Sequence, residues 1–195
     1  MTPTREQAYE LLTTYTKNES LVSHALSVEA VMRHFARTYG EDEEKWGIIG
    51  LVHDLDWDMY PEQHCEKTRE ILEDAGWPQE YIRSIMSHAW GIVTDVKPEH
   101  RMEKVLYATD ELTGLITATA LMRPSRSVLD MKAKSVKKKW KEKSFAAGVD
   151  REIIAAGAQM LEMELSDLIT ETIAAMRTVA PEIGLRGEVT ESDDS

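Results

Sequence analysis

The chain contains a single cysteine, Cys65, so no disulfide can form within it. This shortage is typical of proteins in a reducing compartment, and we expect a cytoplasmic location. Apolar residues never continue for the roughly 18–20 positions that a membrane-spanning helix needs. The first residues also lack the charged and then apolar pattern of a secretory signal. We therefore expect a soluble protein that does not act at a membrane.

Positive charge is also scarce in this sequence. The 23 Lys and Arg residues face 35 Asp and Glu residues, which gives a formal net charge of -12. A protein with this balance repels the backbone of DNA and RNA, so we do not expect a nucleic-acid partner. Residues 123–143 are the exception, because nine basic residues outnumber two acidic ones there.

The remaining composition indicates one folded domain made of helices. The chain has 195 residues, of which 42% are hydrophobic and 30% charged, as in ordinary globular domains. No segment alternates between apolar and polar residues as a strand does, whereas helical spacing recurs throughout. The predicted helices are Thr4–Thr16, Glu19–Tyr39, Glu43–His53, Glu62–Ala75, Pro78–Trp90, Glu99–Met122, Val128–Lys143, Asp150–Gly157 and Ala158–Val179.

These helices predict an all-α, single-domain helical bundle. We place the domain at residues 1–186, with its core at 19–143 and a helical extension after the core. Residues 187–195 are polar and acidic, and we expect them to form a disordered tail.

Histidine and aspartate side chains interrupt the apolar faces of several of these helices. His53 and Asp54 follow an apolar run, and Asp110 lies between leucines in a long helix. A buried carboxylate is costly unless it is paired or binds a metal, and imidazole and carboxylate are common ligands of divalent transition metals. Each residue alone is more often structural, but together they predict a metal site. Its ligands are His24, His53, Asp54, His64, His88 and Asp110.

The order His, His-Asp, Asp resembles the signature of the HD superfamily of metal-dependent phosphohydrolases. Three local sequences also resemble those of the HD superfamily: His53-Asp-Leu-Asp-Trp-Asp, Pro61-Glu-Gln-His-Cys-Glu-Lys and Ala108-Thr-Asp-Glu-Leu-Thr-Gly. The resemblance covers residues 19–143 and implies a bundle of the HD-domain type. It implies one ion held by the four signature residues, which are His24, His53, Asp54 and Asp110.

The resemblance also implies a second ion. HD proteins with two metals insert two further histidines, and His64 and His88 stand in those places, with Asp54 bridging the ions. The expected cofactor is one or two divalent transition metals (Fe, Mn, Zn, Ni or Co), with Mg also open. The alternatives are a surface residue for His64 and a histidine interacting with the helix dipole for His88.

The function that the resemblance implies is hydrolysis of a small phosphorylated metabolite or nucleotide, with a metal-activated water as the nucleophile. Asp54, Asp56 and Asp58 are the expected catalytic residues. The alternatives for Asp56 and Asp58 are outer partners of the metal ligands or a solvated acidic loop, the latter being at least as good a reading. From the basic segment we expect Arg126, Lys134 and Lys137 to bind the substrate, the alternative being a solvated helix face.

Two alternative functions remain open. Some HD proteins use the same ligand order as a di-iron oxygenase, and an HD pocket can also serve as a non-catalytic nucleotide-binding module. A cyclic dinucleotide is not expected as the substrate, because Leu55-Asp56-Trp57 replaces the Ile-Gly-Lys of that branch. The sequence leaves a homo-oligomer open.

Overall fold

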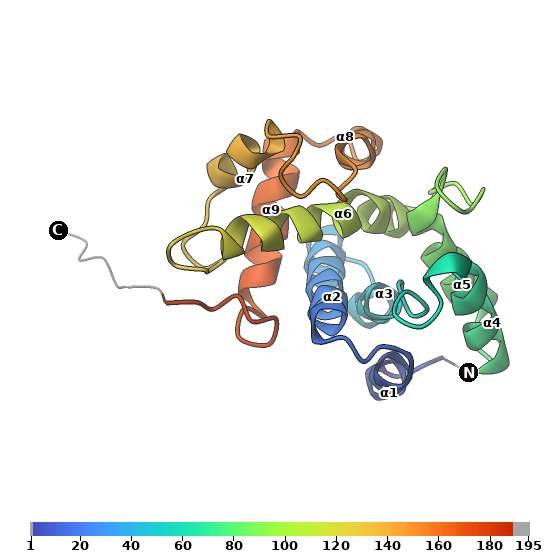
Figure 1. Cartoon of the computed structure of the whole chain (residues 1–195). Helices are drawn as coiled ribbons and strands as arrows, with labels where there is room; N and C mark the ends of the chain where they lie inside the picture. Colours follow the sequence, from blue (N-terminus) through green and yellow to red (C-terminus); the bar gives the residue numbers. More distant parts are fainter. Residues whose placement is uncertain (1, 189–195) are drawn as a thin grey trace.

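The computed structural model of the chain describes residues 2–188 (Figure 1). Its elements are α1 (Arg5–Tyr15), α2 (Glu19–Tyr39), α3 (Glu43–Leu51), η1 (Pro61–Gln63), α4 (Glu66–Asp74), α5 (Gln79–Met86), η2 (Ser87–Ala89), α6 (Arg101–Leu121), α7 (Ala133–Trp140), α8 (Arg151–Met160) and α9 (Leu165–Arg177). No strand forms among residues 2–188, which confirms the all-α prediction. None of the helices in this part of the chain has the length and apolar character needed to cross a membrane.

Two helices of 21 residues, α2 and α6, form the framework of the fold. In Figure 1, α4 and α5 lie toward one end of α6, and α7 and α9 lie toward the other. The start and end of α2 follow from local chemistry. Asn18 accepts a hydrogen bond from the amide of Ser20 (2.9 Å), and Gly40 ends the helix with a φ of 70°.

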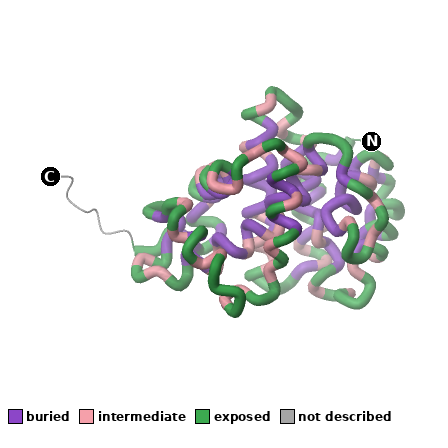
Figure 2. The backbone as a smooth tube through the Cα atoms, turned by 90° about the horizontal axis from the view of Figure 1, so that it is seen from above, coloured by how far each residue is buried: buried purple, intermediate pink, exposed green. Residues whose placement is uncertain are grey.

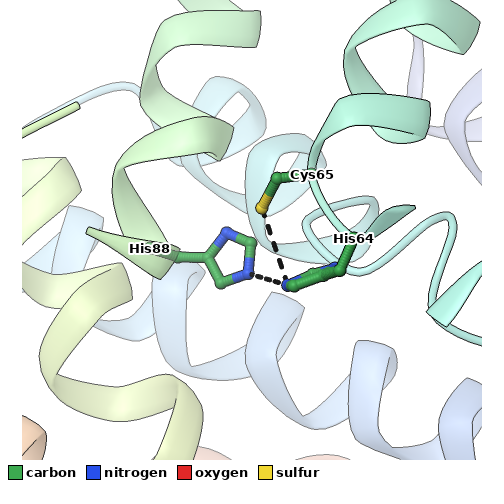
Figure 3. A group of neighbouring side chains, drawn as sticks. All are labelled: His64, Cys65 and His88. Atoms are coloured by element: carbon green, nitrogen blue, oxygen red, sulfur yellow. Dashed lines mark hydrogen bonds between the residues drawn. The ribbon is translucent and has the colours of Figure 1, made fainter. Parts of the chain in front are cut away.

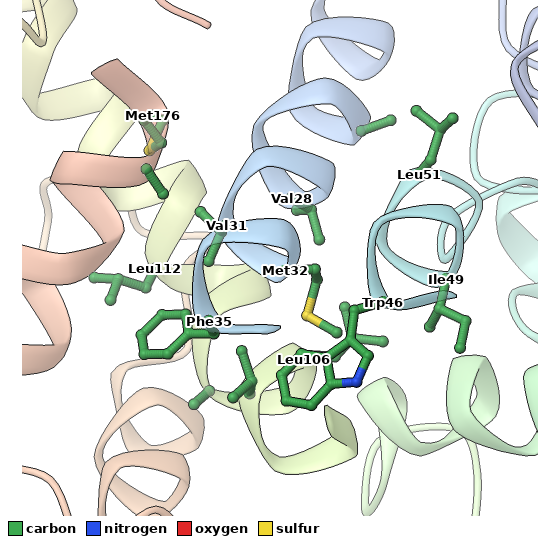
Figure 4. Packing of buried hydrophobic residues seen from close by; sticks show 14 of the residues in the cluster. Val28, Val31, Met32, Phe35, Trp46, Ile49, Leu51, Leu106, Leu112 and Met176 are labelled. Atoms are coloured by element: carbon green, nitrogen blue, oxygen red, sulfur yellow. The ribbon is translucent and has the colours of Figure 1, made fainter. Parts of the chain in front are cut away.

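The core lies where α2, α3, α6 and α9 meet, and buried residues run through the interior of the bundle (Figure 2). Large apolar side chains fill the space between these helices (Figure 4): Val28, Val31, Met32, Phe35, Trp46, Ile49, Leu51, Leu106, Leu112 and Met176. Burial of apolar surface contributes about 25 cal/mol per Å² and holds the helices that carry the histidines in place.

Close helix contacts at two glycines fix the positions of the neighbouring helices. A Cβ atom at Gly50 of α3 would lie 2.8 Å from Cγ of Met32 in α2. A Cβ atom at Gly157 of α8 would lie 2.4 Å from Cβ of Ala108 in α6. Because glycine has no side chain, α3 and α8 can approach these two long helices closely. The first contact sets the end of α3, and therefore His53, beside α2.

Two predicted helices are interrupted in the structure. The segment predicted as Glu62–Ala75 is a short 3-10 turn, η1, followed by α4, because His64 is extended (ψ 137°) and Cys65 has a φ of 67°. The segment predicted as Pro78–Trp90 is α5 followed by the 3-10 turn η2. Helical spacing of apolar residues continues across both breaks, so periodicity did not indicate them.

The C-terminal helices also differ from the prediction. The predicted helix Val128–Lys143 is shorter, since the amide of Val128 donates to the carbonyl of Leu185 (2.9 Å) instead of continuing a helix. The predicted break after Gly157 lies instead at residues 161–164, where Glu162 has a φ of 55°. Gly157 serves helix packing and does not end a helix.

The expected disordered tail at 187–195 falls largely outside the described residues. Of this segment, Gly187 and Glu188 are described, and the amide of Glu188 donates to the carbonyl of Ser125 (2.9 Å). The tail therefore stays a prediction for 189–195.

Candidate metal centre

The six predicted metal ligands come from five segments of the chain and lie together. His24 is in α2, His53 and Asp54 follow α3, and Asp110 is in the middle of α6. Nε2 of His24 lies 3.0 Å from Oδ1 of Asp110 and 3.2 Å from Nε2 of His53. Nε2 of His53 lies 3.2 Å from the same Asp110 oxygen. These three side chains form one group of potential ligands, which we call group 1.

The other two histidines form a second group on the far side of Asp54. His64 follows η1 and His88 lies in η2, and their Nε2 atoms are 3.2 Å apart (Figure 3). We call this pair group 2. Oδ2 of Asp54 lies 3.4 Å from Nε2 of His53, and Oδ1 of Asp54 lies 3.3 Å from Nε2 of His88. One carboxylate oxygen therefore faces each group, as in a bridging ligand.

Backbone carbonyls orient two of the imidazole rings. Nδ1 of His53 donates to the carbonyl of Gly50 (2.8 Å), and Nδ1 of His88 donates to the carbonyl of Ile85 (2.6 Å). A carbonyl oxygen only accepts, so the proton of each ring must be on Nδ1. The Nε2 lone pair of each ring is then free and faces the centre.

Side-chain oxygens orient the other two rings in the same way. Nδ1 of His64 lies 2.9 Å from Oδ1 of Asp56. Nδ1 of His24 lies 3.2 Å from Oγ1 of Thr113, whose hydroxyl donates to the carbonyl of Asp110 (2.8 Å) and therefore accepts from the ring. Such outer partners are the usual supports of metal-binding histidines.

The centre fits a divalent cation. Four Nε2 lone pairs and the oxygens of two carboxylates converge, and lone pairs cannot hydrogen-bond to one another. Burial opposes the charged form of His53, but the carboxylates of Asp54 and Asp110 outweigh it and raise the pKa of His53 well above its ordinary value, so without a metal a proton competes for its Nε2 atom. The site therefore attracts positive charge. His24, His53, Asp54 and Asp110 are close enough together to hold one ion, as are His64, Cys65 and His88.

Comparison with known proteins agrees with this geometry. The family model of the HD domain matches residues 21–117, a segment that contains all six residues. The chain belongs to the HD superfamily. HD domains bind divalent metals, and many are metal-dependent phosphohydrolases. Searches of curated proteins and of solved structures found no significant match.

Five of the six residues of the centre, all except His53, line a cavity of about 340 Å³. Trp57 and Ile92 stand at this cavity with 44% and 58% of their surface exposed. The described residues that line it are Leu21, His24, Asp54, Trp57, His64, His88, Ala89, Ile92, Asp110, Glu111, Gly114, Gly148 and Ile153. This described lining contains no lysine or arginine, and its side chains other than the centre are mainly apolar.

Two of the predicted catalytic aspartates do not line the cavity. Asp56 is fully buried behind His64, and its Oδ2 accepts from the amide of Thr68 (2.8 Å). Oδ2 of Asp58 accepts from the amides of Lys17 (2.7 Å) and Asn18 (3.0 Å), which lowers the pKa of Asp58. The structure thus differs from the expectation of a general acid–base role, and for Asp56 it favours the alternative of an outer partner of a metal ligand. Asp56 positions His64, and Asp58 fastens the α1–α2 loop.

The predicted substrate-binding residues are also absent from the cavity lining. Arg126 is in the loop after α6, and Lys134 and Lys137 are on α7; all three are exposed and none lines the cavity. The buried residue of α7 is Val136, so the helix turns its lysines to solvent. This placement favours the solvated-face alternative.

An acidic residue of the cavity lining did not stand out in the sequence. Glu111 lines the cavity beside Asp110, and its Oε2 accepts from the amide of Asp150 at the start of α8 (3.2 Å). Burial, followed by the charge of Asp110, raises the pKa of Glu111 to about 7. The sequence feature that could have indicated Glu111 is its position next to Asp110, a predicted ligand.

Proposed function

We propose that the chain is a dinuclear metal-dependent hydrolase of small phosphate monoesters, with water as the nucleophile. The observation that carries the proposal is the position of Asp54, whose two oxygens face group 1 and group 2 separately. Membership of the HD superfamily supports the reaction class.

In this proposal group 1 holds one ion, group 2 holds the other, and Asp54 bridges them. Divalent transition metals (Fe, Mn, Zn, Ni or Co) suit these nitrogen and oxygen donors. When bound, such ions supply Lewis-acid activation of a phosphoryl oxygen and of the attacking water. The hydrogen bonds on Nδ1 of the four histidines keep every Nε2 atom aimed at the centre.

The cavity supports a small substrate with one phosphate and an apolar part. Its volume of about 340 Å³ is at the lower end of small-molecule sites. Trp57, Ile92 and Ile153 offer apolar contacts, and the described lining has no cationic side chain to bind a further phosphate. These features favour a monoester over a nucleoside di- or triphosphate.

Glu111 is the best-placed group for proton transfer. Of the described lining residues, it is the carboxylate that is not among the proposed ligands. Its Oε2 is held by the amide of Asp150, so Oε1 is available to take a proton from water or to return one to the leaving oxygen.

The test is phosphate release by metal-loaded protein from a panel of aliphatic, aromatic and nucleoside monophosphates and triphosphates. We expect monoesters to be hydrolysed, Asp54→Asn to lose the activity and Asp58→Asn to keep it. Asp58 is a matched control because it is an aspartate four residues away that does not line the cavity. Two bound ions without phosphate release from any compound would overturn the hydrolase proposal.

The absence of lysine and arginine from the described cavity lining also supports a second candidate function, a di-iron oxygenase acting on a substrate without phosphate. This alternative predicts bound iron, substrate-dependent oxygen uptake and a mixed-valence magnetic-resonance signal after reduction and reoxidation. Iron-loaded protein without that signal would exclude it. A non-catalytic nucleotide-binding module is less well supported, because such a module does not require the complete donor set.

A further inference from the structure

We propose that Cys65 is a further protein ligand of the ion in group 2, giving that ion a thiolate beside His64 and His88. This inference rests on the dinuclear centre proposed above. Sγ of Cys65, Nε2 of His64 and Nε2 of His88 all lie within 4.8 Å of one another (Figure 3). The ligand set of group 2 then differs from that of group 1, which has no sulfur.

Two of the distances between these donor atoms match the edges of a tetrahedral metal site. Metal–nitrogen bonds of about 2.05 Å and metal–sulfur bonds of about 2.3 Å give tetrahedral edges of about 3.3 Å between nitrogens and about 3.6 Å between nitrogen and sulfur. The two Nε2 atoms are 3.2 Å apart, and Sγ lies 3.6 Å from Nε2 of His64. Oδ1 of Asp54 lies 3.3 Å from Nε2 of His88 and 3.7 Å from Nε2 of His64, and is a further donor on this side of the centre.

The backbone at Cys65 supports a role for its side chain. Within residues 21–117, all of which are described, Cys65 is the one non-glycine residue with a positive φ (67°). Glycine would adopt this conformation more easily, and a side chain held there is a recurring feature of functional sites. The conformation turns the thiol inward, where 2% of the residue is exposed.

The thiol has no evident use as a nucleophile. Cys65 does not line the cavity that exposes the centre, so a substrate there would not reach Sγ. The Nδ1 atom of His64 is bound to Asp56, which leaves the thiol to donate its proton to Nε2 of His64 in the metal-free protein. On metal binding, a metal–sulfur bond replaces the S–H bond and the proton passes to solvent.

The test uses Co(II) as a spectroscopic probe on the full chain after removal of other metals. We expect two Co(II) ions per chain and a near-ultraviolet band from thiolate-to-cobalt charge transfer. Because Cys65 is the only cysteine of the chain, this band has one possible protein source. Its final intensity should correspond to one thiolate per chain.

Two variants separate ligation from backbone strain. Cys65→Ser keeps a side chain of similar size. We expect this variant to lose the charge-transfer band and to bind the second Co(II) at least about tenfold more weakly, because even the loss of a group that only supports a metal ligand weakens binding by that factor. Cys65→Gly relieves the positive φ, and we expect it to fold and to show the same loss. Retained affinity in Cys65→Ser would contradict the proposal.

The spectrum of the unmodified protein is decisive even if a variant fails to fold. Bound Co(II) that shows ligand-field bands alone would overturn the role of Cys65, whether one or two ions are present. Phosphate release is measured separately. A thiolate band without phosphate release would support Cys65 as a ligand and contradict the hydrolase proposal. Phosphate release without the band would support the hydrolase proposal and contradict Cys65 as a ligand.

Discussion

Replacing Asp56 by asparagine tests how the ring of His64 is held. Asp56 uses both of its oxygens, Oδ1 with Nδ1 of His64 (2.9 Å) and Oδ2 with the amide of Thr68 (2.8 Å). Asparagine keeps one acceptor and replaces the other oxygen with a donating amide group. In either orientation, one of the two original N–H donors therefore faces another donor.

The chemistry of the two partners indicates which hydrogen bond is lost. The amide of Thr68 can only donate, and leaving it buried without a partner costs about 1–3 kcal/mol. The imidazole of His64 can instead move its proton to Nε2 and accept from asparagine through Nδ1. We expect this second arrangement, in which Nε2 carries a proton and no longer offers a lone pair to group 2. The metal-free stability should then change by less than about 1 kcal/mol, while the affinity for the second ion falls about 10–100-fold.

The assay combines competitive metal titration and elemental analysis with urea unfolding of the metal-free protein. Asp58→Asn is the matched control, because both of its amide partners, Lys17 and Asn18, bind the same oxygen and asparagine can still accept from both. We expect this control to bind two ions normally. Unchanged affinity for the second ion in Asp56→Asn, or equal weakening of both ions, would refute the orientation argument.

Three further predictions concern stability. Burial opposes ionisation of Glu103, but hydrogen bonds from Arg83 and two backbone amides outweigh it and lower the pKa of Glu103 below 4.5. The stabilisation that ionised Glu103 provides is therefore full above the ordinary pKa of 4.5 and is lost as the pH falls through the lower pKa of the folded state. Glu103→Gln should consequently flatten the acid side of a stability–pH curve measured by urea unfolding. Gly157→Ala should destabilise by about 1–3 kcal/mol because its Cβ would clash with Ala108. A Cβ at Gly114 of α6 would instead make an ordinary contact with Cγ2 of Val149 (3.8 Å), so Gly114→Ala should be neutral or stabilising by up to about 1 kcal/mol. Equal effects of the two substitutions in urea unfolding would contradict the packing argument. A divalent ion at 100 times its dissociation constant should add about 2.7 kcal/mol of stability per site, seen as a rise in Tm that a chelator reverses; a Tm unchanged by metal would argue against a native-state site.

Helical periodicity and residue chemistry predicted the parts of the site that lie inside long helices. The apolar spacing of α2 predicted its ends, which the structure places at Glu19 and Tyr39. His24 and Asp110 stood out because each interrupts such spacing. Order along the chain then associated them with His53-Asp54, and the structure brings these residues within hydrogen-bonding distance of one another.

The missed features depend on tertiary contacts that periodicity does not report. Asp56 was expected either in a catalytic role or as an outer partner of a ligand, and only the folded chain after α3, which buries Asp56 against Thr68, favours the second. The basic segment was expected at the substrate because of its charge. Charge alone does not say which side of α7 faces the protein. The burial of Val136 shows that its side of the helix faces inward.

The break at His64 and Cys65 links a wrong helix boundary to the chemistry of the site. A continuous helix through residues 62–75 would give the two residues helical φ and ψ values and set adjacent side chains about 100° apart around its axis. The observed break extends His64 and gives Cys65 a positive φ, so that both side chains face His88. The interruption that periodicity could not predict is therefore what creates group 2.

Charge balance explains why the proposed substrate carries a single phosphate. Two divalent ions with the carboxylates of Asp54 and Asp110 sum to a charge of about +2, and bound ions are the largest charges in such a site. The proposed Cys65 thiolate would lower this sum to about +1. A phosphate monoester carries about -1.5 to -2 near neutral pH, so it matches either value closely. A triphosphate would bring excess negative charge into a cavity whose described lining has no lysine or arginine and includes Glu111. The proposed preference for a monoester therefore rests on a cavity whose described lining lacks cationic side chains and includes Glu111.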